Sequence, residues 1–254
     1  MTGEYPILEF DSERESLIEP SKVLKPLEIP PHCVLAMYDS VLRKLKESSC
    51  LSLVTEIRSM QGNYPVFRME HHGKSLTVAN PGLGAPLVAA FLEELIAFGC
   101  RKFMACGSAG VLDSSLAPGT VVIPTSAVRD EGTSYHYIAP AREIQTDPDV
   151  VAVAESVLRT HRVPYRLGKT WTTDAIYRET KKRIARRRAE GCLAAEMECA
   201  AFLAVAKFRG VRLGQLLAAG DDLGGKEWDC RDALAPSSFH ERLFWLAVEV
   251  CLHL

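Results

Sequence analysis

Short apolar runs alternate with amphipathic segments along most of the chain, the pattern of strands alternating with helices. Strands are predicted at 51–57, 66–69, 76–79, 103–106, 121–124, 167–172 and 213–219, with a short apolar segment at 193–195. Helices are predicted at 32–47, 85–98, 149–160, 179–189, 197–208 and 238–254. Because the connections are short, we expect an α/β fold with one central sheet flanked by helices.

The first 31 residues differ from the rest, because they carry five prolines and little periodicity. We expect residues 1–31 to form an extended N-terminal arm that is ordered only by packing on other elements. No internal repeat or linker interrupts residues 32–254, which are predicted to form a single domain.

Composition narrows the class of protein without identifying it. The 254 residues are 47% hydrophobic, and 30 basic against 32 acidic side chains give a net charge of −2. This balance argues against nucleic acid or a membrane as partner. The eight cysteines form no CxxC pair and no zinc-ligand spacing, so we expect no metal site and a reduced, cytoplasmic protein. The basic run at 181–188 has no interleaved aromatic residues and is interpreted as a solvated helix face.

Polar or glycine-rich breaks follow most of the predicted strands, where α/β proteins bind ligands. One such break, Gly107-Ser-Ala-Gly110, presents backbone N–H groups and the Ser108 hydroxyl to an anion, or is a tight turn that requires glycine. Pro81-Gly-Leu-Gly84 opens the next helix and has the same two interpretations.

Two acidic motifs stand out from apolar surroundings. Glu196-Met-Glu198 interrupts the apolar stretch 192–206, and a carboxylate there suits the two adjacent hydroxyls of a ribose; the alternative is a pair of acids at a helix N-terminus. Asp221 follows the predicted strand 213–219, where partial burial favours a general acid; the alternative is an Asp-rich turn.

Taken in order, these motifs carry a family resemblance. Gly107-Ser-Ala-Gly110, 129–134, 172–177, Glu196-Met-Glu198 and Gly220-Asp-Asp-Leu223 resemble nucleoside phosphorylases of the uridine and hexameric purine type, over residues 32–252. The resemblance implies a single α/β domain with a mixed, partly barrel-like sheet. It also implies cleavage of the N-glycosidic bond of a nucleoside, in most members by phosphate and in some by water.

The resemblance assigns roles to individual positions. It implies that Glu196, Met197 and Glu198 bind the ribose and that Asp221 protonates a purine as the base leaves. Phosphate-binding positions would be Gly84, Gly107 and Ser108, and the base pocket would be formed by Thr172, Thr173, Ile176 and Tyr177. Inorganic phosphate would be a co-substrate, with no cofactor. The resemblance further implies a homo-oligomer, a dimer or a hexamer, in which a neighbour completes each site.

Three departures from the family pattern concern phosphate and the base. The N-terminal Gly-Asp-x-x-Arg motif is absent from the arm, and Ala105 stands where an arginine is expected. Substitute cations among the arginines are Arg58, Arg68 and Arg129. The Gln and Arg that clamp uracil are missing after Tyr177, so the pattern favours a purine nucleoside.

The leading hypothesis is therefore a nucleoside phosphorylase acting on a purine nucleoside. The alternatives are a hydrolytic nucleosidase and a catalytically silent nucleoside-binding protein. A more distant alternative is a serine hydrolase, because Ser108, Asp221 and His240 follow in the chain order of that fold.

Overall fold

The computed structural model describes residues 5–60, 62–231 and 237–254. Within these ranges the strands are β1 His32–Ala36, β2 Leu51–Ser59, β3 Gly62–His71, β4 Lys74–Ala79, β5 Lys102–Val111, β6 Val121–Asp130, β7 Glu143–Gln145, β8 Tyr165–Thr173, β9 Cys192–Glu196 and β10 Arg212–Asp222. The α-helices are α1 Pro20–Val23, α2 Asp39–Glu47, α3 Ala85–Phe98, α4 Pro148–Thr160, α5 Lys181–Ala189, α6 Cys199–Arg209 and α7 Ser237–His253. Three short 3-10 helices are η1 Pro6–Leu8, η2 Ser134–His136 and η3 Ile176–Arg178.

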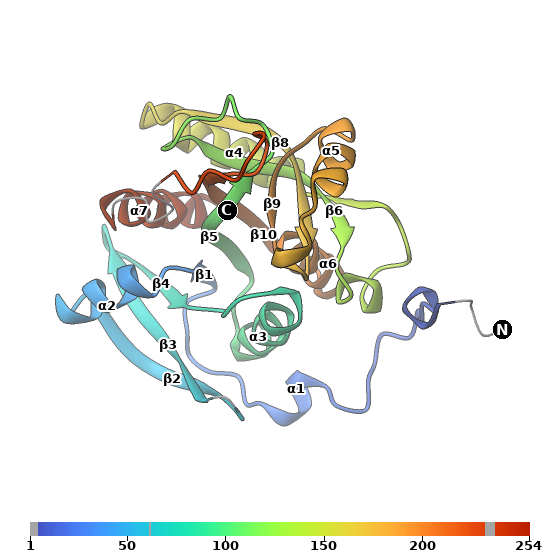
Figure 1. Ribbon diagram of the computed structural model, residues 1–254. Helices are drawn as coiled ribbons and strands as arrows, with labels where there is room; N and C mark the ends of the chain where they lie inside the picture. Colours follow the sequence, from blue (N-terminus) through green and yellow to red (C-terminus); the bar gives the residue numbers. More distant parts are fainter. Residues whose placement is uncertain (1–4, 61, 232–236) are drawn as a thin grey trace.

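All ten strands belong to one mixed sheet, part of which closes on itself (Figure 1). The order is β10-β6-β8-β9-β5-β1-β4-β3-β2, β7 pairs with β6, and β10 also pairs with β5. The extra pairing makes β5, β10, β6, β8 and β9 a closed barrel, from which β1, β4, β3 and β2 extend as an open sheet. The prediction of a partly barrel-like mixed sheet is confirmed.

Strand β5 is shared by the barrel and the open sheet. Its first half pairs in parallel with β1 from Lys102 to Cys106, and its end pairs antiparallel with β9 at Gly110 and Val111. Along its other edge β5 pairs with β10 over nearly its whole length. The sheet therefore divides at Gly107–Gly110, and this division opens space for a ligand at the end of β1.

Helices cover both faces of the sheet and bury two large apolar clusters. One cluster joins α2, α4 and α7 to the sheet, and the other joins α3 and α6 to its opposite face. Neighbouring residues of β5 alternate between them, since Met104 packs in the first cluster and Ala105 in the second. This burial is the main stabilising contribution to the fold.

The prediction of one helix at 32–47 is wrong. Residues 32–36 form β1, a central strand that pairs with β4 on one edge and β5 on the other, and only 39–47 is helical. Cys33, Val34, Leu35 and Ala36 are all fully buried. A run of four apolar residues covered on both faces fits a parallel strand, and its apolar positions also coincided with helical spacing.

The structure differs from the predictions in two further strands, β10 and β7. The predicted loop 220–229 begins too early, because β10 continues to Asp222 and that residue forms a bridge with Asp229. The short strand β7 was not predicted; its three residues are too few to give a period. The apolar segment at 193–195 forms part of β9, which ends at Glu196, and the helix predicted from 197 begins at Cys199 as α6.

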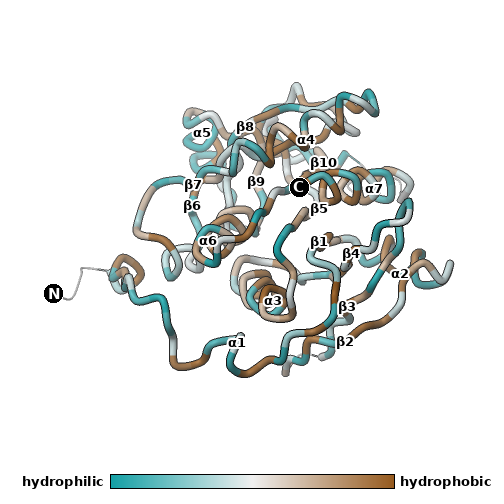
Figure 2. The backbone as a smooth tube through the Cα atoms, turned by 180° about the vertical axis from the view of Figure 1, so that it is seen from behind, coloured by the Kyte–Doolittle hydropathy of each residue, from teal (hydrophilic) through white to brown (hydrophobic). Residues whose placement is uncertain are grey.

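Residues 5–31 follow the outside of the molecule past α3 before entering the sheet at β1 (Figures 1 and 2). Leu24, Leu27 and Ile29 pack against the cluster of α3 and α6, and the Leu27 N–H donates to the Phe98 carbonyl. Glu19 is buried and pairs with Arg209 of α6 at 3.1 Å. These contacts order the segment although it contains only η1 and α1 as regular elements.

Candidate active site

A cavity of about 620 Å³ lies where β5 passes from the open sheet into the barrel, a size that suits a nucleoside-sized ligand. It is lined by the ends of β5, β9 and β10, the loop before α3, the residues after β1, and one side chain of α7. Its lining residues include Met37, Tyr38, Leu83, Ser108, Gly110, Ile176, Glu179, Glu196, Met197, Glu198, Asp221, Leu223 and His240. The two acidic motifs and Ser108, which are far apart in sequence, thus meet around one space.

Glu196 is held entirely by neighbouring donors. Its Oε1 accepts from the hydroxyls of Thr172 at 2.6 Å and Thr170 at 3.1 Å. Its Oε2 accepts from the N–H groups of Glu198 at 2.8 Å and Cys199 at 2.5 Å. Burial raises the pKa of Glu196, and these four donors oppose that effect. The Glu196 carboxyl therefore caps the start of α6 and fixes the turn that presents its neighbours.

Glu198 faces the cavity with fewer partners. Its Oε1 accepts from the Gly84 N–H at 2.7 Å, and its Oε2 from the Met197 N–H at 3.2 Å. Burial, followed by the nearby charge of Glu196, raises the pKa of Glu198 to about 7. Gly84 has a φ of 86°, which favours glycine, so the loop before α3 can turn its amide toward this carboxyl. The result is a buried carboxyl with spare acceptor capacity beside Met197.

A second pair of carboxyls lies at the end of β10. Asp221 Oδ2 accepts from the Trp228 indole at 2.6 Å, which fixes the orientation of the carboxyl. Burial and the negative charge of Asp221 raise the pKa of Glu179 to about 7. Because the negative charges of two neighbouring carboxylates repel each other, the pair tends to retain one proton. This part of the cavity can therefore donate a proton near neutral pH.

The third group of polar side chains is uncharged. The Tyr38 hydroxyl lies 3.1 Å from Ser108 Oγ, and the Tyr38 ring stacks on His240 with centroids 4.0 Å apart and planes 13° apart. Burial lowers the pKa of His240 and raises that of Tyr38. Because Ser108 bonds to Tyr38 and Asp221 to Trp228, the described residues form no Ser108–His240–Asp221 relay of the serine hydrolase type.

The three arginines suggested as phosphate ligands lie away from the cavity. Arg129 is buried, and its guanidinium donates to Ser134 Oγ and to the carbonyls of Ile138 and Ala139 at 2.8–2.9 Å. Arg68 donates to the Glu28 carbonyl, and Arg58 is exposed on β2. Ala105 is fully buried against α3 and α6. In the part of the chain that the structure describes, no lysine or arginine lines the cavity.

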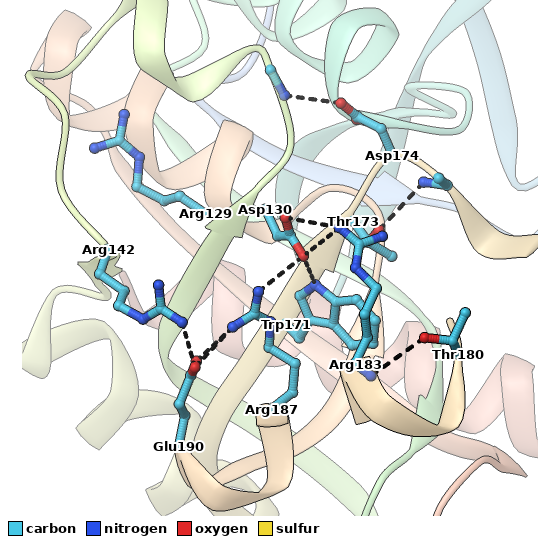
Figure 3. A network of polar contacts seen from close by, with 12 residues as sticks. Arg129, Asp130, Arg142, Trp171, Thr173, Asp174, Thr180, Arg183, Arg187 and Glu190 are labelled. Atoms are coloured by element: carbon cyan, nitrogen blue, oxygen red, sulfur yellow. Dashed lines mark hydrogen bonds and ion pairs between the residues drawn. The ribbon is translucent and has the colours of Figure 1, made fainter. Parts of the chain in front are cut away.

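The basic helix α5 makes structural contacts that its composition does not reveal. Arg183 and Arg187 converge on Asp130, which also accepts from the Trp171 indole at 2.9 Å (Figure 3). Arg187 also pairs with Glu190, and only 8% of its side chain is exposed. One face of α5 is therefore bound to the barrel. The interpretation of the run as a solvated face holds for the exposed side chains Lys181, Lys182, Arg186 and Arg188 and fails for Arg183 and Arg187.

Some of the remaining predicted site residues line the cavity, and others lie away from it. Of the four assigned to the base pocket, Ile176 lines the cavity. The Thr172 hydroxyl is used by Glu196, Thr173 is buried and accepts from the Ala175 N–H, and Tyr177 is 94% exposed. Gly107 packs against Met37, since a Cβ there would lie 3.0 Å from the Met37 sulfur.

Four residues around the site were not found from the sequence. Tyr38 lay within the wrongly predicted helix, and Glu179 was placed in a basic helix that begins only at Lys181. Trp228 had no motif to mark it, and His240 was considered only as part of a triad. Tyr38, Glu179 and His240 share a position near a helix start, which is a weak signal because many other polar residues have it.

Two further observations concern membrane-spanning helices and metal-binding groups. Among the described helices none is long and apolar enough to cross a membrane. The described residues also contain no group of three or more His, Cys, Asp or Glu side chains arranged to hold a metal ion.

A closed barrel continued by an open sheet, with buried carboxyls around a cavity at their junction, defines an α/β enzyme of the nucleoside phosphorylase type. A family model described as the phosphorylase superfamily matches residues 32–241, and the chain belongs to that superfamily.

Individual relatives agree with this assignment. The chain is 28% identical over 181 residues to guanosine phosphorylase from Halorubrum lacusprofundi, covering 69% of this chain and 75% of that protein. It is 34% identical over 155 residues to uridine phosphorylase from Treponema pallidum, covering 56% and 59%.

Solved structures show the same fold. Uridine phosphorylase from Vibrio fischeri matches with a TM-score of 0.75 at 23% identity, covering 89% of this chain and 94% of that one. AMP nucleosidase from Bacteroides thetaiotaomicron matches with a TM-score of 0.71 at 20% identity, covering 88% and 87%.

Proposed function

We propose that this enzyme cleaves the N-glycosidic bond of a purine nucleoside. The observation that carries the proposal is the meeting of Glu198 and Asp221 in one cavity, each oriented by a short hydrogen bond from an N–H donor, Gly84 for Glu198 and Trp228 for Asp221. Glu198 retains acceptor capacity for the ribose 2′- and 3′-hydroxyls, with Met197 packed against the sugar. Asp221 donates to the purine ring the proton that it shares with Glu179.

This assignment follows the charge that develops during the reaction. As the bond between the sugar and the base breaks, positive charge grows on the ribosyl carbon and negative charge on the leaving base. A carboxylate at the sugar and a proton donor at the base both bind this transition state more tightly than the substrate. A purine suits the pair of acids because its ring nitrogens accept a proton, and its size suits the cavity.

Two nucleophiles are candidates, phosphate and water. The names of the matched relatives, guanosine phosphorylase and uridine phosphorylase, support phosphorolysis. The absence of lysine and arginine from the described lining supports hydrolysis. The residues outside the described ranges, 1–4, 61 and 232–236, contain no lysine or arginine in their sequence either. We therefore propose hydrolysis for the chain by itself, while phosphorolysis requires cations from a second copy.

The proposal is tested by incubating the protein with adenosine, guanosine, inosine and uridine, with and without phosphate, and measuring free base by chromatography. We expect release from at least one purine nucleoside. Asp221→Asn and Glu198→Gln are each expected to lower the rate by a factor of about 10² or more, because they remove proton transfer and charge stabilisation.

The outcomes separate the alternatives. Tight nucleoside binding without base release from any substrate would refute the enzyme proposal and support a silent binding protein. Release from uridine alone would refute the purine preference. Release that requires phosphate, with ribose 1-phosphate as product, would establish phosphorolysis, and an oligomer at assay concentration would then identify the source of the cations.

A further inference from the structure

Three uncharged side chains from separate elements meet where the resemblance places a phosphate ion. Tyr38 follows β1, and Ser108 lies on β5 within the segment Gly107–Gly110, where the sheet divides. His240 lies in the first turn of α7, which begins at Ser237. The Tyr38 hydroxyl lies 3.1 Å from Ser108 Oγ, and the Tyr38 ring stacks on the imidazole. The stacking restricts rotation of the imidazole, so His240 is held at the cavity wall in one plane.

His240 is held as a neutral base. Burial alone lowers its pKa, and two of the cationic groups on the neighbouring helix α2 are paired with carboxylates. On α2, Lys44 pairs with Glu241 at 2.5 Å and Arg43 with Asp39 at 2.6 Å. The other titratable groups that line the cavity are Tyr38, Glu179, Glu196, Glu198 and Asp221. Tyr38 remains a neutral phenol because burial raises its pKa. A neutral imidazole has one ring nitrogen free to accept a proton.

The charges around the cavity also favour a neutral nucleophile. A phosphate dianion bound here would face the carboxyls of Glu198 and Glu179, with no lysine or arginine in the described lining to offset the repulsion. Water carries no charge and needs only an acceptor for its proton. Ser108 and Tyr38 can hold such a water by hydrogen bonds without changing its charge.

The geometry points to His240 as the general base of a hydrolytic reaction, an inference that rests on the proposed N-glycosidic cleavage. Water attacks the ribosyl C1′, and His240 takes one of its protons as the new C–O bond forms. The C–N bond breaks, and its electron pair goes to the purine, which receives from Asp221 the proton that this carboxyl shares with Glu179. The products are free ribose and free base. The imidazolium then releases its proton to solvent, and Asp221 regains one from solvent.

The test uses four variants of the full chain and the best purine nucleoside from the panel. His240→Phe keeps a ring to stack on Tyr38 but has no base, and His240→Gln keeps polarity without basicity. His240→Ala leaves space that imidazole from solution can occupy, whereas the Phe ring fills that space. His253→Phe is the matched control, an exposed histidine near the end of the same helix.

We expect His240→Phe and His240→Gln to lower kcat by a factor of about 10² to 10³ with little change in KM, while His253→Phe has the wild-type rate. Added imidazole is expected to restore His240→Ala at least tenfold and to leave His240→Phe unchanged. Wild-type reactions in H₂¹⁸O containing millimolar phosphate should give ribose labelled with ¹⁸O. Melting temperatures identify any variant that fails to fold.

The inference fails if a folded His240→Phe or His240→Gln keeps its rate within threefold of wild type. It also fails if the wild type forms unlabelled ribose 1-phosphate, in which case N-glycosidic cleavage still stands. The proposed function itself fails only if no purine nucleoside is cleaved under any condition, so the two failures are distinguishable.

Discussion

Replacing Glu198 by glutamine is expected to stabilise the protein at alkaline pH while abolishing its activity. In the folded state the pKa of this carboxyl is raised to about 7, mainly because it is buried and secondly because Glu196 lies beside it. The reference pKa is 4.5, so the ionised form is disfavoured by up to about 3.4 kcal/mol. Glutamine carries no charge, and its amide oxygen can still accept from the Gly84 N–H.

The sign of the pH dependence follows from where the proton is bound. Between pH 4.5 and about 7 the folded wild type holds a proton at Glu198 that the unfolded chain has released. The stability of the wild type relative to the variant is therefore greatest below pH 4.5. It decreases as the pH rises through this window and is constant above it. We expect the variant to be more stable by about 1–3 kcal/mol at pH 8 and to differ little at pH 4.5.

Urea denaturation of both proteins at pH 4.5 and pH 8 measures this difference, and Glu196→Gln provides the contrast. Glu196 accepts four hydrogen bonds from two hydroxyls and two backbone N–H groups. An amide NH₂ placed among those donors loses bonds and is expected to cost about 1–3 kcal/mol at pH 8. A Glu198→Gln variant that is equal to or less stable than wild type at pH 8 would refute the reasoning.

Three other predictions concern the acid pair and the packing around the site. In the wild type, kcat/KM for base release should decline above about pH 7 as the proton shared by Glu179 and Asp221 is lost. In Glu179→Gln the charge repulsion that retains this proton is gone, so the decline should move to lower pH, and an unmoved decline would exclude Glu179 as its cause. Arg187→Ala should cost about 3 kcal/mol in urea denaturation, because it leaves Asp130 and Glu190 short of a buried partner. Lys181→Ala, which removes an exposed ion pair, should cost less than about 1 kcal/mol, and equal costs would contradict the difference in burial. Gly110→Ala places a Cβ 2.6 Å from Leu223 and 3.3 Å from Asp221, whereas the nearest atoms to a Cβ at Gly107 belong to the flexible Met37 side chain. The rate of base release should therefore fall severalfold more in Gly110→Ala than in Gly107→Ala.

Most of the fold followed from local pattern. Strands β9 and β10 were predicted close to their observed positions because each is an apolar run that ends at an acidic or glycine-rich segment. Strand β5 was predicted only at 103–106, but it continues through the predicted glycine-rich break at 107–110 to Val111, because its pairing with β10 and β9 holds those residues in the sheet. The failure at 32–36 has a physical cause. A strand buried on both faces has no alternation, so its spacing carries no information that separates it from a helix.

The site residues that could be predicted from the sequence are charged residues that interrupt apolar stretches. Glu198 and Asp221 stand out because carboxyls are rare within apolar runs, and a buried charge is costly without a purpose. Glu196 shares that signal, but its four donors come from β8 and from the start of α6, and only tertiary structure brings them together. The stacking of Tyr38 on His240 joins residues about 200 positions apart, which a single sequence cannot show.

The shared strand β5 constrains how this chain can vary. Its residues are held in register by β1, β9 and β10, so losing one residue between Lys102 and Ala105 would move Ser108 against three neighbours and turn its side chain to the opposite face. A side-chain replacement, such as alanine at position 105, leaves every one of those pairings intact. Changes of reaction chemistry on this scaffold are therefore expected to arise by substitution along β5, whereas insertions and deletions are confined to the loops.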